Sequence, residues 1–376
     1  MIKRAIISGG GTGGHIFPAL AIANEIMRRN PEAEILFVGA LGKMEMEKVP
    51  AAGYKIIGLP IAGFQRKLTF SNFILPFKLI NSLFKAYKIL KNFKPEVVVG
   101  VGGYASGPTL RAAIFAGIPT LIQEQNSFPG KTNKFLSGKV NAICTAYDGL
   151  ENFFPEEKIV ETGNPVRAEM IAIEGKKEEA YSFFGLNPNK KTILVIGGSL
   201  GARTLNESVL EGMKLIKENQ VQVLWQCGKF YFEKMKETLS QINHEGVHLN
   251  EFIARMDLAY AAADIIISRA GAISVSELCL IHKPTILVPS PNVAEDHQTK
   301  NAMALVNKNA AILVKDIEAK NHLMAKAIEL IGSENKLKEL SEAIAKMGKP
   351  NASKMIVDEL EKIKKLADLK ISKLGD

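Results

Sequence analysis

The sequence is poor in cysteine and tryptophan, and it has no long apolar run. Only three of the 376 residues are Cys and one is Trp. Cys144, Cys227 and Cys279 lie far apart without any Cys-x-x-Cys spacing, which favours buried thiols over a disulfide framework or a metal site. No run of about 18 apolar residues occurs, so we expect no membrane-spanning helix. Met1–Arg4 lead directly into a short apolar strand, which argues against a signal peptide and for a soluble intracellular protein.

One long segment lacks acidic residues altogether. Between Lys48 and Lys94 there is no Asp or Glu but nine Lys and Arg, a number equal to the net charge of +9 of the whole chain. Such an excess is typical of proteins that bind nucleic acid, an anionic membrane or a phosphorylated ligand. Large apolar residues are interleaved with these bases, at helical spacing from Phe77 to Leu90, and no RNA-binding motif accompanies them. We therefore favour docking on a membrane surface over binding of nucleic acid.

A core-facing helix with a solvated lysine face is the alternative for this segment. The residues expected at the membrane are Phe73, Leu75, Phe77, Lys78, Leu79, Phe84, Lys85 and Lys88.

Apolar runs alternate with helical patterns in two series. The first series starts with a strand at Arg4–Ser8, and the second starts again at Thr192–Ile196. Continuous apolar strands that alternate with helices predict parallel, doubly wound sheets, so two restarts predict two Rossmann-like α/β domains. Further strands are expected at Glu34–Val38, Val97–Gly100, Pro119–Gln123, Ala142–Ala146, Val221–Gln226, Asp264–Ser268 and Thr285–Pro289.

The length and the two restarts also predict the domain boundaries. We expect an N-terminal domain over residues 1–163 and a C-terminal domain over residues 164–350, with turn chemistry at Gly163–Arg167 between them. Residues 351–376 are expected to form a helix that packs back on the domains. The apolar face of that helix would consist of Ile356, Leu360, Ile363 and Leu366.

Three glycine-rich turns each follow a predicted strand and precede a predicted helix: Gly9–Gly14, Gly102–Pro108 and Gly197–Ala202. Ligands of open α/β sheets bind at the carboxyl ends of the strands, where glycines and helix N-termini let backbone amides approach a phosphate. The first turn also fits the G-x-G-x-x-G dinucleotide pattern, with Glu32 and Glu34 near the expected offset, so an NAD-dependent oxidoreductase stays open. Tight packing could explain one such loop, whereas three loops favour two phosphate-bearing ligands.

Seven short blocks of sequence, in order over residues 5–305, together resemble those of the GT-B glycosyltransferases that extend a lipid-linked peptidoglycan precursor. These blocks are Gly9–His15, Gly102–Pro108, Glu124–Asn126, Gly163–Arg167, Gly197–Ala202, Ser268–Glu277 and Asp296–Ala302. The resemblance implies a GT-B fold, with two Rossmann-like domains facing across a cleft. It also implies inverting transfer of GlcNAc from UDP-GlcNAc to the 4-hydroxyl of MurNAc in undecaprenyl-pyrophosphoryl-MurNAc-pentapeptide.

The resemblance further implies a peripheral protein on the cytoplasmic face of the cell inner membrane. Its partners would be the two substrates and the anionic membrane surface, with other cell-wall synthesis proteins as further candidates. It implies no cofactor, and the sequence has no carboxylate cluster that suggests a metal ion.

The resemblance also assigns the binding residues. Contacts with UDP-GlcNAc are expected at Thr12, Gly13, Gly14, Asn126, Arg167, Ser199, Ile253, Ala272, Ile273, Ser274, Val275, Ser276, Glu277 and Gln298. The acceptor diphosphate is expected at Gly11, Gly102, Gly103 and Tyr104.

The chemistry of four of these side chains suits the assignment. The guanidinium of Arg167 suits a phosphate, and the Glu277 carboxylate can accept both hydrogen bonds of a ribose diol. Gln298 and Asn126 offer amides to sugar hydroxyls. The competing interpretations are a surface arginine, a solvated helix carboxylate and, for Ile253, a core side chain. His297 is a further candidate sugar contact.

His15 is the candidate general base. It lies at the start of a predicted helix, where the positive end of the helix dipole disfavours a protonated imidazole. A neutral imidazole there could take the proton from the attacking hydroxyl of the acceptor. A role in capping the helix or in binding phosphate stays open.

Three further functions compete with a transferase of this kind besides the oxidoreductase. A UDP-GlcNAc 2-epimerase would need extra acidic catalytic groups and no membrane patch. If the protein were a diacylglycerol galactosyltransferase, the glycine pair Gly102 and Gly103 on the acceptor side would have no explanation. A non-catalytic membrane-binding module is disfavoured by the complete set of donor-site residues.

Overall fold

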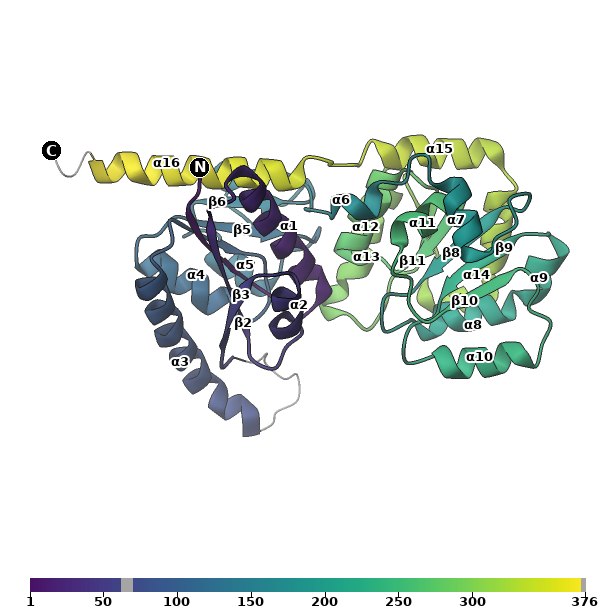
Figure 1. Ribbon diagram of the computed structural model, residues 1–376, viewed down its shortest axis with the longest axis horizontal. Coiled ribbons are helices and arrows are strands. Elements are labelled where there is room, and N and C mark those ends of the chain that lie inside the picture. Colours follow the sequence, from purple (N-terminus) through teal and green to yellow (C-terminus); the bar gives the residue numbers. More distant parts are fainter. Residues whose placement is uncertain (62–69, 373–376) are drawn as a thin grey trace. The chain divides into compact units, whose positions relative to one another are not determined.

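The computed structural model describes residues 1–61 and 70–372, without the side chains of residues 70–76, 168, 294 and 371. The chain divides into two compact units, one formed by Met1–Val166 with Pro350–Asp376 and the other by Arg167–Lys349 (Figure 1). Each unit contains a parallel sheet with helices packed on it. The predicted fold class, two doubly wound α/β domains, is confirmed.

In the first unit, the described residues form one parallel sheet in the order β3-β2-β1-β4-β5-β6-β7. The elements are β1 (Arg4–Ser8), α1 (Gly13–Arg29), β2 (Glu34–Ala40), α2 (Glu45–Ala51), β3 (Lys55–Leu59), α3 (Phe70–Phe93), β4 (Val97–Gly100), α4 (Ser106–Phe115), β5 (Thr120–Glu124), α5 (Lys131–Leu136), β6 (Ala142–Thr145), η1 (Glu156–Lys158), β7 (Ile159–Glu161) and α16 (Ala352–Ser372). The strand order reverses between β1 and β4, so the loops that follow these two strands meet at the carboxyl edge of the sheet.

Successive residues of β1 point to opposite faces of this sheet, and both faces are covered. Ala5 and Ile7 belong to the core layer that includes α1 and α16, whereas Ile6 belongs to the layer that includes α3 and α4. Burial on both faces explains why the central strands are continuously apolar rather than alternating.

The last helix, α16, packs on α1 of the first unit. Ile356, Leu360 and Ile363 are buried in the core layer of α1, as expected. The expectation for Leu366 was wrong, because its side chain is 51% exposed. The apolar face of α16 therefore ends about one turn earlier than its spacing predicts.

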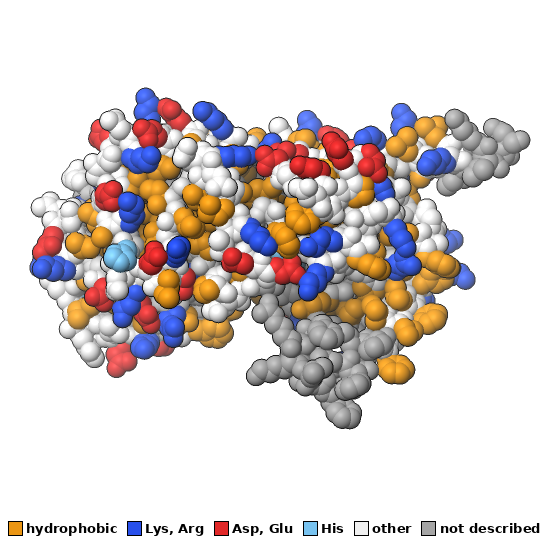
Figure 2. Space-filling model, turned by 180° about the vertical axis from the view of Figure 1, so that it is seen from behind, with side chains coloured by type: hydrophobic (Ala, Val, Ile, Leu, Met, Phe, Trp, Pro, Cys, Tyr) orange, Lys and Arg blue, Asp and Glu red, His pale blue; other side chains and the backbone are white. Residues whose placement is uncertain are grey.

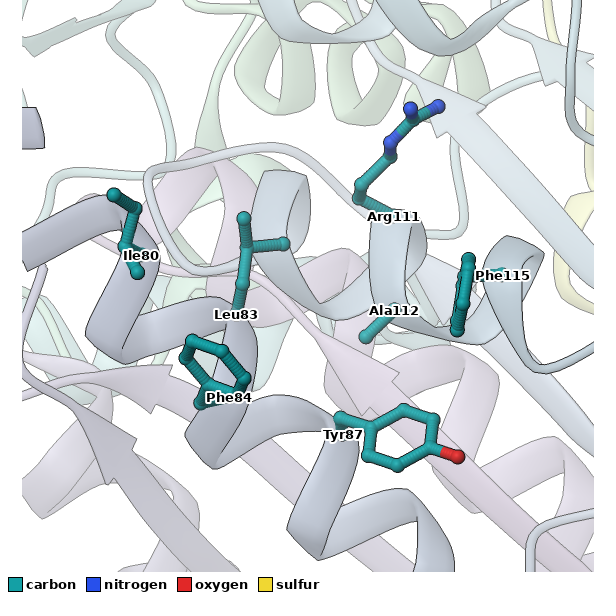
Figure 3. A pocket seen from close by; sticks show the side chains of 7 residues that line it. All are labelled: Ile80, Leu83, Phe84, Tyr87, Arg111, Ala112 and Phe115. Atoms are coloured by element: carbon teal, nitrogen blue, oxygen red, sulfur yellow. The ribbon is translucent and has the colours of Figure 1, made fainter.

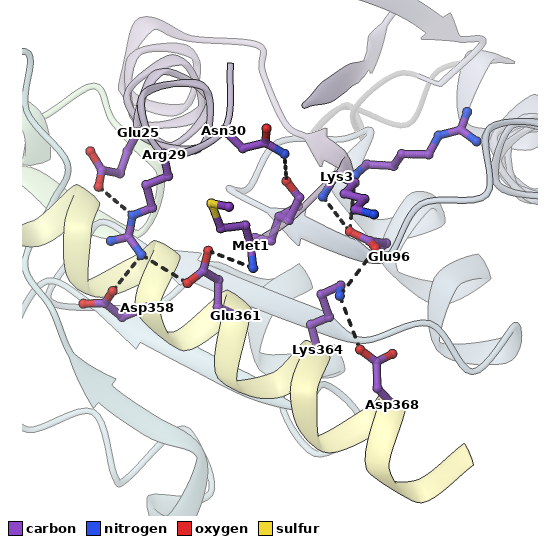
Figure 4. Close-up of polar contacts among 12 residues, drawn as sticks. Met1, Lys3, Glu25, Arg29, Asn30, Glu96, Asp358, Glu361, Lys364 and Asp368 are labelled. Carbon is purple, nitrogen blue, oxygen red and sulfur yellow. Dashed lines mark hydrogen bonds and ion pairs between the residues drawn. The ribbon is translucent and has the colours of Figure 1, made fainter. Parts of the chain in front are cut away.

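Polar contacts also hold α16 in place (Figure 4). Arg29 of α1 bonds Asp358 at 2.7 Å and the Lys354 carbonyl at 2.8 Å. Farther along α16, Lys364 lies 3.4 Å from Glu96, which accepts the Lys3 backbone amide at 2.6 Å. The C-terminal segment is thus joined to the end of α1 and to the segment that precedes β4.

The second unit repeats the arrangement, with a parallel sheet of order β10-β9-β8-β11-β12-β13 among the described residues. The elements are α6 (Ala168–Ile171), α7 (Lys177–Phe184), β8 (Thr192–Ile196), α8 (Arg203–Glu211), α9 (Met213–Glu218), β9 (Gln222–Gln226), α10 (Phe232–Ser240), β10 (Val247–Asn250), α11 (Met256–Ala262), β11 (Ile265–Ser268), α12 (Ala272–Ile281), β12 (Thr285–Leu287), η2 (Ala294–Asp296), α13 (His297–Val306), β13 (Ile312–Leu313), α14 (Asp316–Ile331) and α15 (Glu334–Ala345). The order reverses between β8 and β11, which places the loops after these strands together.

The helical segment that follows β8 is divided at Gly212 into α8 and α9. A Cβ at Gly212 would lie 2.4 Å from Cγ of Met324 on α14, so the close approach of α14 requires glycine there.

No helix within residues 1–61 and 70–372 is both long and apolar enough to cross a membrane.

Candidate active site

The loops after β1 and β4 pack against each other at the carboxyl edge of the first sheet. The Gly10 amide donates to the Gly102 carbonyl at 3.3 Å. A Cβ on Gly103 would lie only 2.3 Å from the Gly10 carbonyl oxygen, and the φ of Gly103 is +85°. Packing between the loops is therefore enough to explain Gly103 without a ligand. Tyr104, the next residue, is 49% exposed.

Helix α1 starts directly after the first loop. Thr12 is its extended N-cap residue, Gly13 and Gly14 form its first turn, and no acidic residue lies in that turn. First-turn amides have no carbonyl partner within the helix, and the helix dipole places partial positive charge there. The start of α1 can therefore bind an anion such as a phosphate.

The ring of His15 is oriented by the same loop. Its Nδ1 lies 2.9 Å from the Gly10 carbonyl oxygen and 3.4 Å from the Thr12 hydroxyl. A carbonyl can only accept, so Nδ1 carries the hydrogen and, in the neutral ring, Nε2 carries the lone pair. That Nε2 faces the loop after β4, because a Cβ on Gly102 would lie 2.8 Å from it. The ring donates to a carbonyl instead of accepting from a helix amide, which argues against the capping role.

Sequence reasoning missed Glu45, which lies against the first loop. Its side chain is 1% exposed, and its two carboxylate oxygens accept the Gly11 amide at 2.7 Å and the Ala40 amide at 2.9 Å. The Gly11 amide, expected at the acceptor diphosphate, is thus bonded to a carboxylate here. Gly11 lies 34 residues away from Glu45 in sequence, so the pattern around Glu45 gave no signal of this contact.

Asn126 is fixed at the end of β5 by its neighbour in the same block. Its backbone amide and its side-chain amide donate to one oxygen of the Glu124 carboxylate, at 3.0 and 3.2 Å. The other oxygen of Glu124 accepts the Gly130 amide and the Asn133 side chain. Glu124 is buried and positions the loop that carries Asn126.

Asn164, in the segment expected to be a linker, is buried in the first unit. Its side chain accepts from Gln123 at 3.0 Å and donates to the Gln125 carbonyl at 3.0 Å. The block Gly163–Arg167 thus contributes to the edge of the first sheet as well as joining the units.

In the second unit, α12 begins at the carboxyl end of β11. Gly271 is its extended N-cap residue. Ser274 is half-buried, and Ser276 donates its hydroxyl to the Ala272 carbonyl at 3.0 Å. The buried residues of this stretch are Ala272, Ile273, Val275 and Glu277. Over Ala272–Ser276, the backbone amides of the first turn, more than the side chains, are therefore the groups that can meet a ligand.

Glu277 is 9% exposed and accepts a hydrogen bond from the Tyr260 hydroxyl at 3.1 Å. Burial raises the pKa of Glu277 above its ordinary value, and the Tyr260 bond and the positive charge of Arg167 partly oppose this shift. Burial also raises the pKa of Tyr260, with a further contribution from the Glu277 charge. The solvated-carboxylate interpretation is thus wrong, because Glu277 is buried and hydrogen-bonded to Tyr260. Tyr260 was missed because it lies on another helix, α11.

Gln226, at the end of β9, ties two loops of the second unit together. Its amide nitrogen donates to the Gly198 carbonyl at 3.1 Å, and its oxygen accepts the Ile253 amide at 2.8 Å. Ser199, next to Gly198, is exposed in the loop that follows the central strand β8. The Ile253 side chain is buried and its amide is engaged, so its carbonyl is the atom left for a ligand. Sequence reasoning missed Gln226.

Gln298 joins the loops after β11 and β12. Its side-chain oxygen accepts the Ser290 amide at 2.9 Å and the Ala270 amide at 3.3 Å. The amide NH2 is therefore the end of Gln298 that can donate to a ligand. Glu295 and Asp296, just before α13, both have left-handed φ values of 53° and 54°, a strained conformation often found near binding sites.

A pocket of about 460 Å³ lies between α3 and α4 in the first unit (Figure 3). Its lining is mostly apolar and consists of Ile80, Leu83, Phe84, Tyr87, Arg111, Ala112 and Phe115. Phe84 and Phe115 are 72% and 82% exposed.

Figure 2 shows hydrophobic side chains gathered on the first unit, with Lys and Arg among them. We name the exposed residues Phe77, Leu79, Ile80, Phe84, Tyr87 and Phe115 the α3–α4 patch. Sequence reasoning missed Arg111 and Phe115 on α4.

The predicted membrane residues have different surroundings. Phe77 is 74% exposed, Lys78 is half-buried and Lys88 is exposed. Lys85 instead donates to the Gly58 carbonyl at 2.8 Å and is half-buried, so it also stabilises the fold. The side chains of Phe73 and Leu75 lie outside the described residues.

No three His, Cys, Asp or Glu side chains in the described part of the chain form a group that could hold a metal ion. The expected donor contacts are divided between the units: Thr12, Gly13, Gly14 and Asn126 lie in the first, and the others lie in the second.

Comparison with known proteins gives two family matches. The model of the glycosyltransferase family 28 N-terminal domain matches residues 5–145, and that of the C-terminal domain matches residues 192–356. A protein of Bacteroides fragilis, named UDP-N-acetylglucosamine–N-acetylmuramyl-(pentapeptide) pyrophosphoryl-undecaprenol N-acetylglucosamine transferase, is 57% identical over 96% of this chain and 95% of its own. A Flavobacterium psychrophilum protein of the same name is 55% identical over 96% of this chain and 97% of its own.

Solved structures agree on the fold. The crystal structure of Acinetobacter baumannii MurG has a TM-score of 0.77 and 29% identity, covering 96% of this chain and 99% of that one. The UDP-GlcNAc 2-epimerase of Neisseria meningitidis, solved with UDP-GlcNAc, has a TM-score of 0.66 and 18% identity, covering 96% of this chain and 100% of that one. The epimerase shares the fold alone.

Proposed function

The chain belongs to glycosyltransferase family 28, and we propose on that premise that it transfers GlcNAc from UDP-GlcNAc to undecaprenyl-pyrophosphoryl-MurNAc-pentapeptide. The observation that carries this proposal is the 57% identity to a transferase of that name over nearly the full length of both chains. The local geometry in each unit supports it, because the start of α12 offers backbone amides to a diphosphate and the ring of His15 has its Nδ1–H bonded to the Gly10 carbonyl.

We assign most of the donor contacts to the second unit. The amides at the start of α12 and the Arg167 guanidinium suit the diphosphate. The buried Glu277 carboxylate suits the ribose diol, since an ionised acceptor makes strong hydrogen bonds. The Ile253 carbonyl suits the uracil ring, and the Gln298 NH2 and the Ser199 hydroxyl suit the sugar and phosphate oxygens. Thr12, Gly13, Gly14 and Asn126 would add contacts from the first unit.

Transfer itself is assigned to His15. Its Nε2 would take the proton of the acceptor 4-hydroxyl while that oxygen forms a bond to the anomeric carbon of GlcNAc. The bond from that carbon to the diphosphate breaks on the opposite face, which inverts the configuration and releases UDP. Arg167 and the α12 amides would stabilise the negative charge that develops on the leaving diphosphate. The loop at Gly102–Tyr104, against which Nε2 lies, would hold the acceptor diphosphate.

A peripheral position on the cytoplasmic face of the inner membrane fits the α3–α4 patch. An exposed apolar surface with lysines at its rim can insert its rings among lipid chains while the lysines contact anionic headgroups. We define the patch-reversal variant as Lys78→Glu, Lys88→Glu and Lys91→Glu, which leaves out Lys85 because of its bond to Gly58. The control-reversal variant, with the same charge change on the second unit, is Lys217→Glu, Lys234→Glu and Lys236→Glu.

Acceptor-dependent release of UDP tests the proposed function. Purified protein is mixed with UDP-GlcNAc, with and without the lipid-linked MurNAc-pentapeptide, and UDP is measured by a coupled assay. UDP-glucose and UDP-GalNAc serve as alternative donors. We expect release only with acceptor present and a preference for UDP-GlcNAc. Release that does not depend on the acceptor, or that is equal for all three donors, would contradict the proposal.

A further inference from the structure

One peptide group of the first loop is hydrogen-bonded on both sides by ionisable side chains. The Gly10 carbonyl accepts from His15 Nδ1 at 2.9 Å. The Gly11 amide donates to Glu45 Oε2 at 2.7 Å. This carbonyl and this amide belong to the same peptide bond, so Glu45 and His15 are connected through a single peptide.

The position of Glu45 is closely fixed. Its other oxygen accepts the Ala40 amide at 2.9 Å, and its side chain is 1% exposed. A Cβ at Gly10 would lie 2.2 Å from the Glu45 Cδ, and a Cβ at Gly39 would lie 2.6 Å from its Cγ. Two glycines thus make room for this carboxylate. A buried carboxylate is costly unless its oxygens are hydrogen-bonded, and here two backbone amides meet that need.

The connection has a defined electronic effect. A carboxylate that accepts a peptide N–H polarises the peptide and places more negative charge on its carbonyl oxygen, because hydrogen bonds in a chain strengthen one another. The Gly10 carbonyl then holds the Nδ1 hydrogen more firmly and stabilises the imidazolium that forms when Nε2 takes a proton. In serine proteases a carboxylate acts on a histidine in this way by direct contact.

We propose that Glu45 is a positioning residue for His15, acting through the Gly10–Gly11 peptide to fix the Nδ1–H tautomer and to raise the basicity of Nε2. This proposal rests on the proposed role of His15 as the base. The competing explanation is that Glu45 only supports the shape of the loop.

The other ionisable groups nearby differ in place and exposure. The loop that faces Nε2 carries Tyr104, whose side chain is half exposed. Lys43, before α2, and Glu47, on α2, are exposed. Glu47 is therefore the matched control for Glu45, since it lies on the same short helix and carries the same charge in water.

The first experiment is NMR of protein labelled with 15N in the histidine rings. His15 is assigned by comparison with a His15→Gln variant, and its tautomer and pKa are followed in the wild type, Glu45→Gln and Glu47→Gln. We expect the Nδ1–H tautomer in the neutral wild-type ring. A nearby carboxylate favours the charged imidazolium, so its removal in Glu45→Gln should lower the pKa of His15 by about half to one pH unit. Glu47→Gln should leave it unchanged.

The same variants are compared in the pH dependence of turnover. The acid limb of kcat should move to lower pH in Glu45→Gln by the same amount, and the plateau should fall by about 2- to 3-fold because the base is weaker and proton transfer is only partial in the transition state. KM for UDP-GlcNAc should change little. A purely structural role would lower the amount of folded protein or the plateau without moving the acid limb.

Glu45→Asp is the second variant, because Gln would place an NH2 against a backbone N–H and can disturb folding. Asp keeps the charge but draws it back, so the shift should have the same direction and a smaller size. An unchanged pKa and tautomer of His15 in both folded variants would overturn the proposal. If the His15 pKa shifts while His15→Ala keeps normal turnover, Glu45 does position the ring and the base assignment is the part that fails.

Discussion

Replacing Glu277 by Gln should weaken the binding of UDP without lowering the stability of the folded protein. The substitution keeps the shape and one acceptor for the Tyr260 hydroxyl, which lies 3.1 Å away, and it removes the negative charge. If Glu277 accepts the ribose diol, at least one hydrogen bond to a charged group is lost. Such a bond contributes roughly 1.5–3 kcal/mol. Calorimetric titration should therefore show UDP binding weakened by about 10- to 150-fold.

The substitution should leave the stability of the folded protein unchanged or raise it. Burial raises the pKa of Glu277, so between its ordinary and its raised pKa the folded protein binds more protons than the unfolded chain. The stability of the wild type therefore falls as pH rises through that window, and the ionised carboxylate weakens folding at neutral pH. At pH 7.5 the Tm of Glu277→Gln should equal or exceed that of the wild type, and any advantage should vanish below about pH 4.

Binding should also respond to pH. The affinity of the wild type for UDP should fall as acidification protonates Glu277, whereas the affinity of Glu277→Gln should show only the titration of UDP itself. Glu233→Gln, an exposed acid on α10 of the same unit, is the matched control and should leave both properties unchanged. Unchanged UDP affinity in Glu277→Gln would refute the ribose assignment. Weaker binding with a large loss of Tm would show a structural effect instead.

Three further predictions follow from the site and the fold. His15→Ala should lower turnover about 100-fold while UDP affinity changes little, and near-normal turnover would place the base elsewhere. Gly103→Ala should lower the free energy of unfolding by about 2–4 kcal/mol in denaturant titration, because its Cβ would lie 2.3 Å from the Gly10 oxygen at a φ of +85°; an unchanged midpoint would contradict the loop packing. The patch-reversal variant should bind anionic vesicles at least about 100-fold more weakly in co-sedimentation, at about 1 kcal/mol per lysine, whereas the control-reversal variant should bind normally. Retention of the patch-reversal variant on the vesicles would leave a core-facing helix as the better explanation.

The central strands could be predicted from the sequence, and the edge strands could not. The strands at Arg4–Ser8 and Thr192–Ile196 were predicted with the bounds that the structure has, because both are buried on both faces and read as short apolar runs. The sequence did not reveal β3, β7, β10 or β13. These strands lie toward the sheet edges and are partly exposed, so polar and charged residues interrupt their apolar pattern.

The residues proposed to touch a ligand were easier to find from the sequence than those that support them. His15, Glu277 and Gln298 stand in recognisable blocks, and their chemistry suggests a role from the sequence alone. Glu45, Gln226 and Tyr260 act through contacts with residues far away in the chain or on other helices. Their surroundings appear only once the strands are placed in order, because a one-dimensional pattern does not show which loops meet.

The central claim is tested most directly by the mass and linkage of the product. The protein is incubated with UDP-GlcNAc and lipid-linked MurNAc-pentapeptide, and the lipid fraction and the nucleotide sugars are analysed by mass spectrometry and NMR. The account predicts that the acceptor gains one GlcNAc in β linkage to the MurNAc 4-hydroxyl, with one UDP released for each. An unmodified acceptor, together with free UDP or an epimerised sugar, would contradict it.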